Sequence, residues 1–229
     1  MEGNHEQQRI RRLGIGIIAA VAVGIPATAA VATVPHYVTV KPAAKPASVN
    51  PKVTIHHGVT KPDRLGTSSV TRCSGGPAAG TLRLANYVEC WWPRGENWGI
   101  YNCRTVHGST SLSLHAGGRA YDHHLSVHDA KDKAAGDSIV AAFLRADSKG
   151  NKYALAKRFG VQEIIWNCRI WTSARASEGL LPYGACPTTS DTIAHRDHVH
   201  IGQNLRGANR QTTAYTGWSW CEPRDGMCN

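Results

Sequence analysis

An uncharged apolar run near the N-terminus divides this chain into a tail and a part that can fold. Residues 13–34 carry no charge and follow an arginine-rich segment, residues 9–12. Six of the eleven prolines lie in the first 65 residues, whereas all seven tryptophans lie after Cys90. Because a packed core needs large apolar side chains, we expect one folded domain over residues 66–229.

The basic segment and the apolar run together are typical of an export signal. The small-residue triplets at 27–29 and 30–32 offer cleavage sites. The run is also long enough to span a bilayer as an uncleaved anchor. Residues 1–34 are therefore predicted to be a signal peptide or a membrane anchor. The protein is predicted to be extracellular or in the cell wall, either secreted or attached to the plasma membrane by this segment.

Residues 35–65 are predicted to be a linker, because prolines recur through a polar, lysine-bearing stretch. The chain has 26 Lys and Arg against 16 Asp and Glu, and half of its +10 net charge lies in the first 65 residues (8 basic minus 3 acidic). A basic spacer outside a cell suits anionic wall polymers or lipid head groups, but a solvated tether without a partner fits equally. Nucleic-acid binding is a poor explanation of the charge, because no motif for it is present.

Seven cysteines are spread along the chain without a CxxC pair. This spacing argues against a zinc ribbon or a thioredoxin-type redox site and favours disulfides in an oxidising compartment. Because the number is odd, at least one cysteine is free or pairs between chains. Cys168 and Cys186, which are close in sequence, are predicted to pair.

The periodicity of apolar residues predicts a mixture of helices and short strands. Helices are expected over residues 136–145, 152–159 and 205–213, and strands over residues 161–166, 169–172 and 198–202. These elements show no regular βαβ rhythm. The fold class is therefore predicted to be α+β, with a small antiparallel sheet flanked by helices.

Two histidine-bearing clusters suggest a metal site. The first cluster is residues 113–122 and the second is residues 195–200. Alternate residues of a strand share a face, so His198 and His200 are expected to point into one site. A catalytic zinc ion needs three protein ligands and one open position, and His115, Asp122 and His200 would supply two imidazoles and one carboxylate. His195 fits either the site or the surface.

Catalytic and substrate-binding roles can be assigned around this predicted zinc site. Asp197, three residues before His200, is predicted to be the general base, and His198 to donate a hydrogen bond to the oxyanion. Ser113 is predicted to orient a ligand or hold the loop, and Arg119, or else Arg104, to bind a substrate carboxylate. Each residue also has an ordinary structural explanation, such as a surface ion pair for Asp197.

The first cluster resembles a known superfamily, which contains zinc D-alanyl-D-alanine peptidases, lysostaphin-type endopeptidases and the hedgehog signalling domain. The pattern Ser-x-His-x-x-Gly-x-Ala-x-Asp of the D-alanyl-D-alanine peptidase branch is matched by Ser113, His115, Gly118, Ala120 and Asp122. The resemblance implies that the His and Asp of this pattern bind zinc, together with a later His. It also implies a hedgehog/D-alanyl-D-alanine-peptidase-like fold.

The second cluster maps onto the same resemblance with two departures. That branch has a Glu base and a Trp just before the third ligand, where this chain has Asp197 and Val199. The sequences of both clusters resemble most an extracellular domain group of actinobacteria. The chain is thus expected to be an exported zinc peptidase that hydrolyses peptide bonds in peptidoglycan stem peptides or cross-links. The alternatives are a non-catalytic cell-wall or surface binding domain of the same fold, and a lysin.

Overall fold

A computed structural model of the chain describes residues 61–216. The predicted signal peptide or anchor, and the linker up to residue 60, lie outside the described residues. Within residues 61–216, no helix is long and apolar enough to cross a bilayer.

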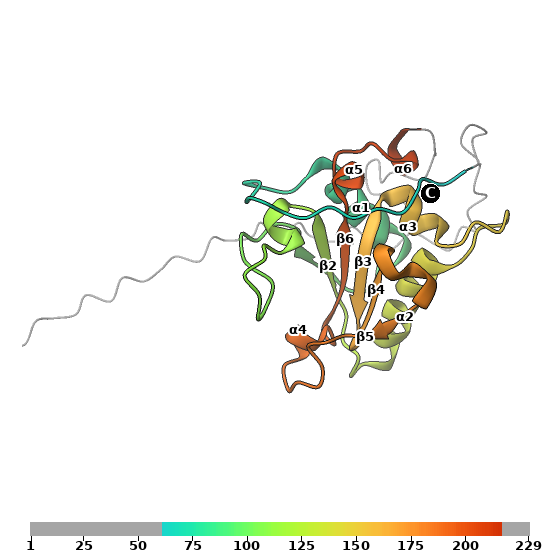
Figure 1. The fold of residues 1–229 in the computed structure, drawn as a ribbon. Helices are drawn as coiled ribbons and strands as arrows, with labels where there is room; N and C mark the ends of the chain where they lie inside the picture. Colours follow the sequence, from blue (N-terminus) through green and yellow to red (C-terminus); the bar gives the residue numbers. More distant parts are fainter. Residues whose placement is uncertain (1–60, 217–229) are drawn as a thin grey trace, which may run out of the picture. The chain divides into compact units, whose positions relative to one another are not determined.

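One antiparallel sheet of six strands is the centre of the fold (Figure 1). Its strands, in spatial order, are β1 (Glu96–Gly99), β2 (Ala120–His124), β6 (His198–Gln203), β3 (Val161–Trp166), β4 (Arg169–Thr172) and β5 (Leu181–Pro182). Every neighbouring pair is antiparallel. The prediction of an α+β fold with an antiparallel sheet is confirmed.

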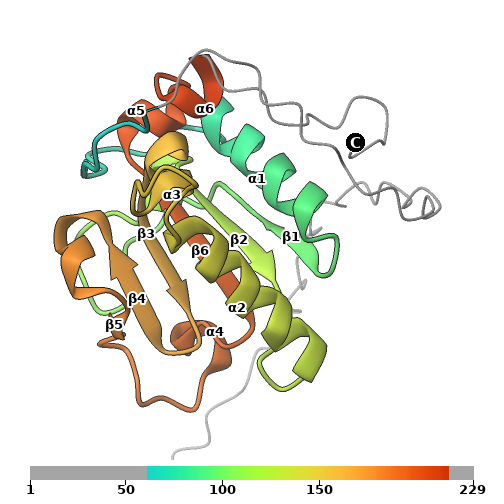
Figure 2. The same ribbon diagram turned by 90° about the vertical axis from the view of Figure 1, so that its right-hand side faces the viewer.

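The helices that carry most of the core cover one face of this sheet (Figure 2). They are α1 (Ala79–Trp91), α2 (Ala130–Leu144) and α3 (Ala154–Phe159). Shorter helical segments are η1 (Leu114–Gly117), η2 (Ser173–Glu178), α4 (Asp191–Ala194), α5 (Leu205–Ala208) and α6 (Thr213–Thr216). The other face, which we call the open face, is turned toward the viewer in Figure 1, and only short segments cross its upper part.

Strand alternation separates the apolar core from polar side chains on the open face. Tyr121 of β2 and Ile201 of β6 are fully buried against the helices. Their strand neighbours Asp122 and His200 therefore point to the opposite face. In this way the sheet places Asp122 and His200 away from the helix-covered core, whereas His123 lies on the core side and contacts the hydroxyl of Tyr121 at 2.8 Å.

Close packing between α2 and β3 depends on a glycine within the helix. A Cβ added at Gly136 would lie 2.5 Å from two ring carbons of Trp166. The Trp166 indole also donates to Asp137 in the same helix at 3.0 Å. The helix itself begins at Asp129, whose carboxylate accepts from the backbone N–H groups of residues 131 and 132.

The predicted helix over residues 205–213 is wrong as one continuous element. The structure has two short helices there, α5 and α6, separated by four residues that include Arg210. Arg210 has a backbone φ of 58°, which belongs to the left-handed region and ends a right-handed helix.

Two disulfides join cysteines within the described residues. Cys168 pairs with Cys186, as predicted, and Cys73 pairs with Cys103. Disulfides persist in oxidising compartments, so these two bonds support an extracellular location.

Candidate metal centre

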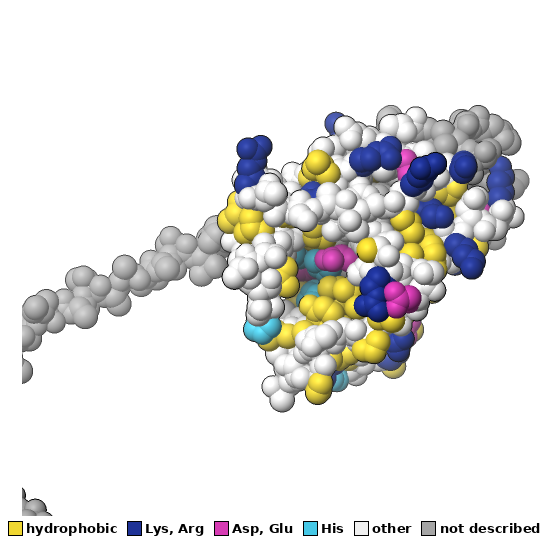
Figure 3. All heavy atoms as spheres, viewed as in Figure 1, with side chains coloured by type: hydrophobic (Ala, Val, Ile, Leu, Met, Phe, Trp, Pro, Cys, Tyr) yellow, Lys and Arg dark blue, Asp and Glu magenta, His cyan; other side chains and the backbone are white. Residues whose placement is uncertain are grey.

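The predicted metal ligands meet on the open face of the sheet. Asp122 of β2 lies opposite His200 of β6 in the strand register. His115 comes from η1, which packs against both strands. Figure 3 shows a hollow on this face, in which histidine and acidic side chains gather among apolar ones.

The three candidate ligands are close enough to bind one ion, because one donor atom from each lies within 4.8 Å of the other two. Nε2 of His115 lies 3.1 Å from Oδ2 of Asp122 and 3.2 Å from Nδ1 of His200. Nδ1 of His200 lies 2.9 Å from Oδ1 of Asp122. A tetrahedral zinc ion with bonds of about 2.1 Å holds its donor atoms about 3.4 Å apart. The two imidazoles and one carboxylate therefore fit a zinc ion in both chemistry and spacing.

The outward nitrogen of each candidate ligand histidine already has an acceptor. Nδ1 of His115 lies 2.8 Å from the backbone oxygen of Ile100. Nε2 of His200 lies 3.1 Å from Oε1 of Glu163. When these outward nitrogens carry the hydrogen of a neutral ring, both inward nitrogens present a lone pair. Two lone pairs then face the Asp122 carboxylate, an arrangement that favours a cation between them.

The electrostatics of the cluster support the same conclusion. Burial raises the pKa of Asp122, but in the metal-free protein its hydrogen bonds with His115 and His200 outweigh burial and hold the pKa well below its usual range. Burial lowers the pKa of His200, but hydrogen bonds to Asp122 and Glu163 outweigh it and raise the pKa to about 9. Without a metal, a proton on His200 supplies the positive charge that the two carboxylates favour.

Asp197 and His198 form a hydrogen-bonded pair beside the cluster. Oδ1 of Asp197 lies 2.7 Å from Nδ1 of His198, and the hydroxyl of Thr192 donates to Oδ2 of Asp197. The other nitrogen of His198, Nε2, lies 3.7 Å from Oδ1 of Asp122. The structure therefore places the His198 ring between Asp197 and the predicted metal ligands.

Aromatic rings line two sides of the hollow. Trp98 of β1, which is 47% exposed, stacks on His124 with ring centroids 4.1 Å apart, and it also lies 5.8 Å from the His198 ring. On the other side, the His195 ring lies 4.5 Å from His198 and 5.1 Å from Tyr183. His195, which the sequence left open, thus belongs to the site.

A hairpin turn fixes the position of His195. Asn167 and Cys168, which join β3 to β4, have backbone φ values of 47° and 59°. Their N–H groups donate to the backbone oxygens of His195 and Ala194 at 2.6 and 3.0 Å. The Cys168–Cys186 disulfide attaches the segment with Tyr183 to the same turn. The turn and the disulfide together hold this aromatic wall.

The two predicted substrate-binding residues have structural partners. The hydroxyl of Ser113 accepts from the backbone N–H of His115 at 3.3 Å and caps η1. The guanidinium of Arg119 is 3% exposed and donates to the hydroxyl and the backbone oxygen of Ser68. Ser113 thus holds the backbone of the candidate ligand His115. Arg119 instead binds the segment around Ser68 and is not brought into the hollow.

Glu163 is a residue of the site that the sequence patterns did not predict. Its carboxylate contacts a predicted ligand, although it lies in a strand identified by its apolar residues. The available signal was one acidic residue inside a strand of mainly apolar residues, which is unusual without a partner.

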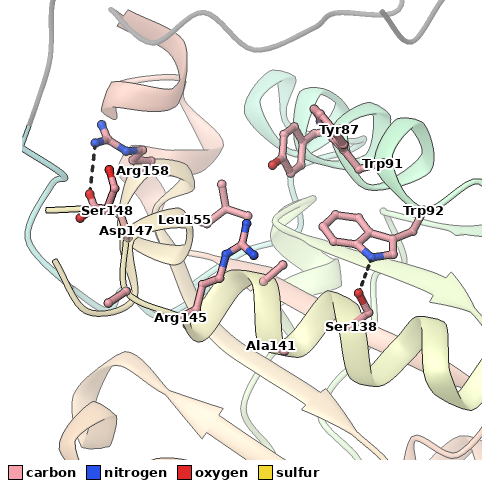
Figure 4. Close-up of a pocket in the computed structure, with 13 residues that line it drawn as sticks. Tyr87, Trp91, Trp92, Ser138, Ala141, Arg145, Asp147, Ser148, Leu155 and Arg158 are labelled. Atoms are coloured by element: carbon pink, nitrogen blue, oxygen red, sulfur yellow. Dashed lines mark hydrogen bonds and ion pairs between the residues drawn. The ribbon is translucent and has the colours of Figure 1, made fainter. Parts of the chain in front are cut away.

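A second concavity lies on the helix-covered side. It has a volume of about 720 Å³ and lies between α1, α2 and α3 (Figure 4). Tyr87, Trp91 and Trp92 line one side, and the Trp92 indole donates to Ser138 at 3.1 Å. None of the predicted site residues lines this concavity.

Comparison with protein-family models finds a match for this chain. Residues 73–195, more than half of the chain, match the VldE C-terminal domain. The chain belongs to the VldE C-terminal domain family. Comparison with curated proteins and with solved structures finds no match. The part that matches the VldE C-terminal domain includes His115, Asp122 and Glu163, and it ends before His198 and His200.

Proposed function

We propose that this protein is an exported zinc-dependent peptidase that hydrolyses peptide bonds in peptidoglycan stem peptides or cross-links. The observation that carries the proposal is the convergence of His115, Asp122 and His200, with both outward ring nitrogens already bonded to acceptors. The resemblance to the superfamily of D-alanyl-D-alanine peptidases supports the reaction class. The two disulfides support a location outside the cell.

His115, Asp122 and His200 would hold the zinc ion. When bound, zinc acts as a Lewis acid on a carbonyl oxygen and lowers the pKa of a water molecule toward neutrality. A peptidase also needs a group that moves protons beside the reacting bond.

The geometry favours His198 for proton transfer, with Asp197 as its positioning residue. The sequence instead suggested Asp197 as the general base and His198 as the donor to the oxyanion. Nε2 of His198 faces the three candidate ligands. Both oxygens of the Asp197 carboxylate already accept hydrogen bonds, from His198 and Thr192. Asp197 holds the hydrogen on Nδ1, so Nε2 is free to accept a proton from water and deliver it to the leaving amine.

Digestion of purified peptidoglycan tests the proposed reaction. The full chain, loaded with zinc, should release peptides with new amino termini that mass spectrometry identifies. The variant His115→Ala should bind no zinc and release nothing. If the zinc-loaded protein binds wall material but releases no peptide, the protein is a non-catalytic wall-binding domain and not a peptidase.

Anionic wall polymers are the proposed partners of the basic surface. Figure 3 shows lysine and arginine side chains around the upper rim of the open face. Removal of wall teichoic polymers from the sacculus should then weaken retention of the protein, which cosedimentation at low and high salt measures.

A further inference from the structure

We infer that Glu163 is a positioning residue of the metal site, which fixes the His200 ring with Nδ1 toward the ion. The inference rests on the proposed metal centre. Oε1 of Glu163 lies 3.1 Å from Nε2 of His200. Within residues 61–216, His200 is the one hydrogen-bond partner of this carboxylate.

The pairing of β3 with β6 brings Glu163 to the open face. Ile165 lies opposite His200 and Glu163 lies opposite Gly202, so these four residues share one face of the sheet. The register shifts between Val161 and Glu163. An irregularity of this kind re-aims a side chain, and such irregularities are common beside active sites.

Gly202 provides the space that Glu163 occupies. A Cβ at this position would lie 2.9 Å from Cγ and 3.3 Å from Oε1 of Glu163, and it would also collide with Leu114. The Glu163 side chain thus passes over the bare backbone of β6 to reach His200. A side chain at residue 202 would push it away.

The contact decides which nitrogen of His200 is available. A carboxylate that accepts from Nε2–H keeps the hydrogen on that nitrogen and leaves the Nδ1 lone pair for the ion. The backbone oxygen of Ile100 does the same for the opposite nitrogen of His115. One histidine therefore faces the ion through Nε2 and the other through Nδ1, and each is held by a different acceptor.

Zinc affinity of full-length variants tests this role. Glu163→Ala should raise the zinc dissociation constant 10- to 100-fold, as loss of an outer hydrogen-bond partner does elsewhere. Gly202→Ala should also weaken binding, because it displaces both Glu163 and Leu114, the neighbour of His115. Glu163→Gln keeps an oxygen that accepts from Nε2–H, so it should recover most of the affinity. Glu96→Gln, on the exposed strand β1, is the matched control and should bind zinc normally.

Cobalt substitution adds a readout that a merely structural role would not change. The visible spectrum of the cobalt form should shift in Glu163→Ala and stay close to wild type in Glu163→Gln. Unchanged zinc affinity and an unchanged cobalt spectrum in Glu163→Ala would overturn the inference. An equal loss of zinc affinity in Glu163→Ala and Glu163→Gln, accompanied by a lower melting temperature in both, would also overturn the inference. Failure of the wild-type chain to bind zinc would instead overturn the metal centre itself, and failure to cleave peptides would leave the Glu163 result standing.

Discussion

At the scale of single residues, the site depends on which nitrogen or oxygen atom faces inward. The residue types and the strand alternation predicted His115, Asp122 and His200 as ligands, and the structure brings them together. The relation between Asp197 and His198 could not be predicted in this way, because neighbouring residues of a strand normally point apart. Asp197 lies just before β6, where the chain is free to turn its carboxylate toward the His198 ring.

Replacement of His198 by alanine should separate zinc binding from catalysis. His198 contributes no atom to the three-ligand cluster, so zinc content should stay unchanged. Hydrolysis should fall roughly 10²- to 10⁴-fold, the usual effect of losing a general base. His128→Ala, at an exposed histidine paired with Asp191, is the control and should retain full rates. Full activity of His198→Ala would assign proton transfer to another group.

Zinc affinity should rise with pH until His200 loses its proton. In the metal-free protein, the carboxylates raise the pKa of His200 to about 9, so below this pH zinc must displace a proton. Competition with a chelator between pH 6.5 and 10 should show affinity increasing up to about pH 9 and then levelling. An affinity independent of pH over this range would contradict the arrangement of the ligands.

At the scale of the elements, apolar runs predicted some strands well and turn conformations poorly. Strands β3 and β4 have the predicted bounds, because each is a short run with β-branched and aromatic residues next to a helix or a turn. The helix α1 was missed, although Leu84, Ala85 and Val88 recur at helical spacing on its buried side. The left-handed conformation of Arg210 has no signal in the residue type, so the break between α5 and α6 was not foreseen.

The packing of α2 on β3 makes Gly136→Ala destabilising. Alanine is favoured over glycine inside a helix by up to about 1 kcal/mol. The new methyl group would collide with the Trp166 ring, and overpacking of this kind costs about 1–3 kcal/mol. Urea unfolding should therefore show a net loss of stability. Gly184→Ala, where the added Cβ meets nothing within 4 Å, should be neutral or slightly stabilising.

Loss of the Cys168–Cys186 disulfide should lower stability and loosen one wall of the site. The bond closes a loop with a sequence separation of 18, for which chain entropy predicts about 3 kcal/mol of stabilisation. The double variant Cys168→Ser and Cys186→Ser should show this loss in denaturant unfolding. Equal unfolding midpoints for the variant and the wild type would show that the loop is ordered without the bond.

At the scale of the whole molecule, the metal centre exists only after long-range folding. His115 and His200 are 85 positions apart, and they meet because β6 pairs with β2 on one side and β3 on the other. Local sequence patterns could predict the ligands of this site but not Glu163, whose role depends on the register of β3 against β6. The open face is free for the site because the helices cover the other face of the sheet (Figure 2).

Elemental analysis of the purified full chain for zinc is the sharpest test of the three-ligand site. One zinc ion per wild-type chain is expected after loading and dialysis. The same content is expected in Asp197→Ala and almost none in Asp122→Ala or His200→Ala, provided that circular dichroism shows all four proteins folded. A folded wild-type chain without zinc, or a zinc content unchanged by the two ligand substitutions, would rule out His115, Asp122 and His200 as a zinc site.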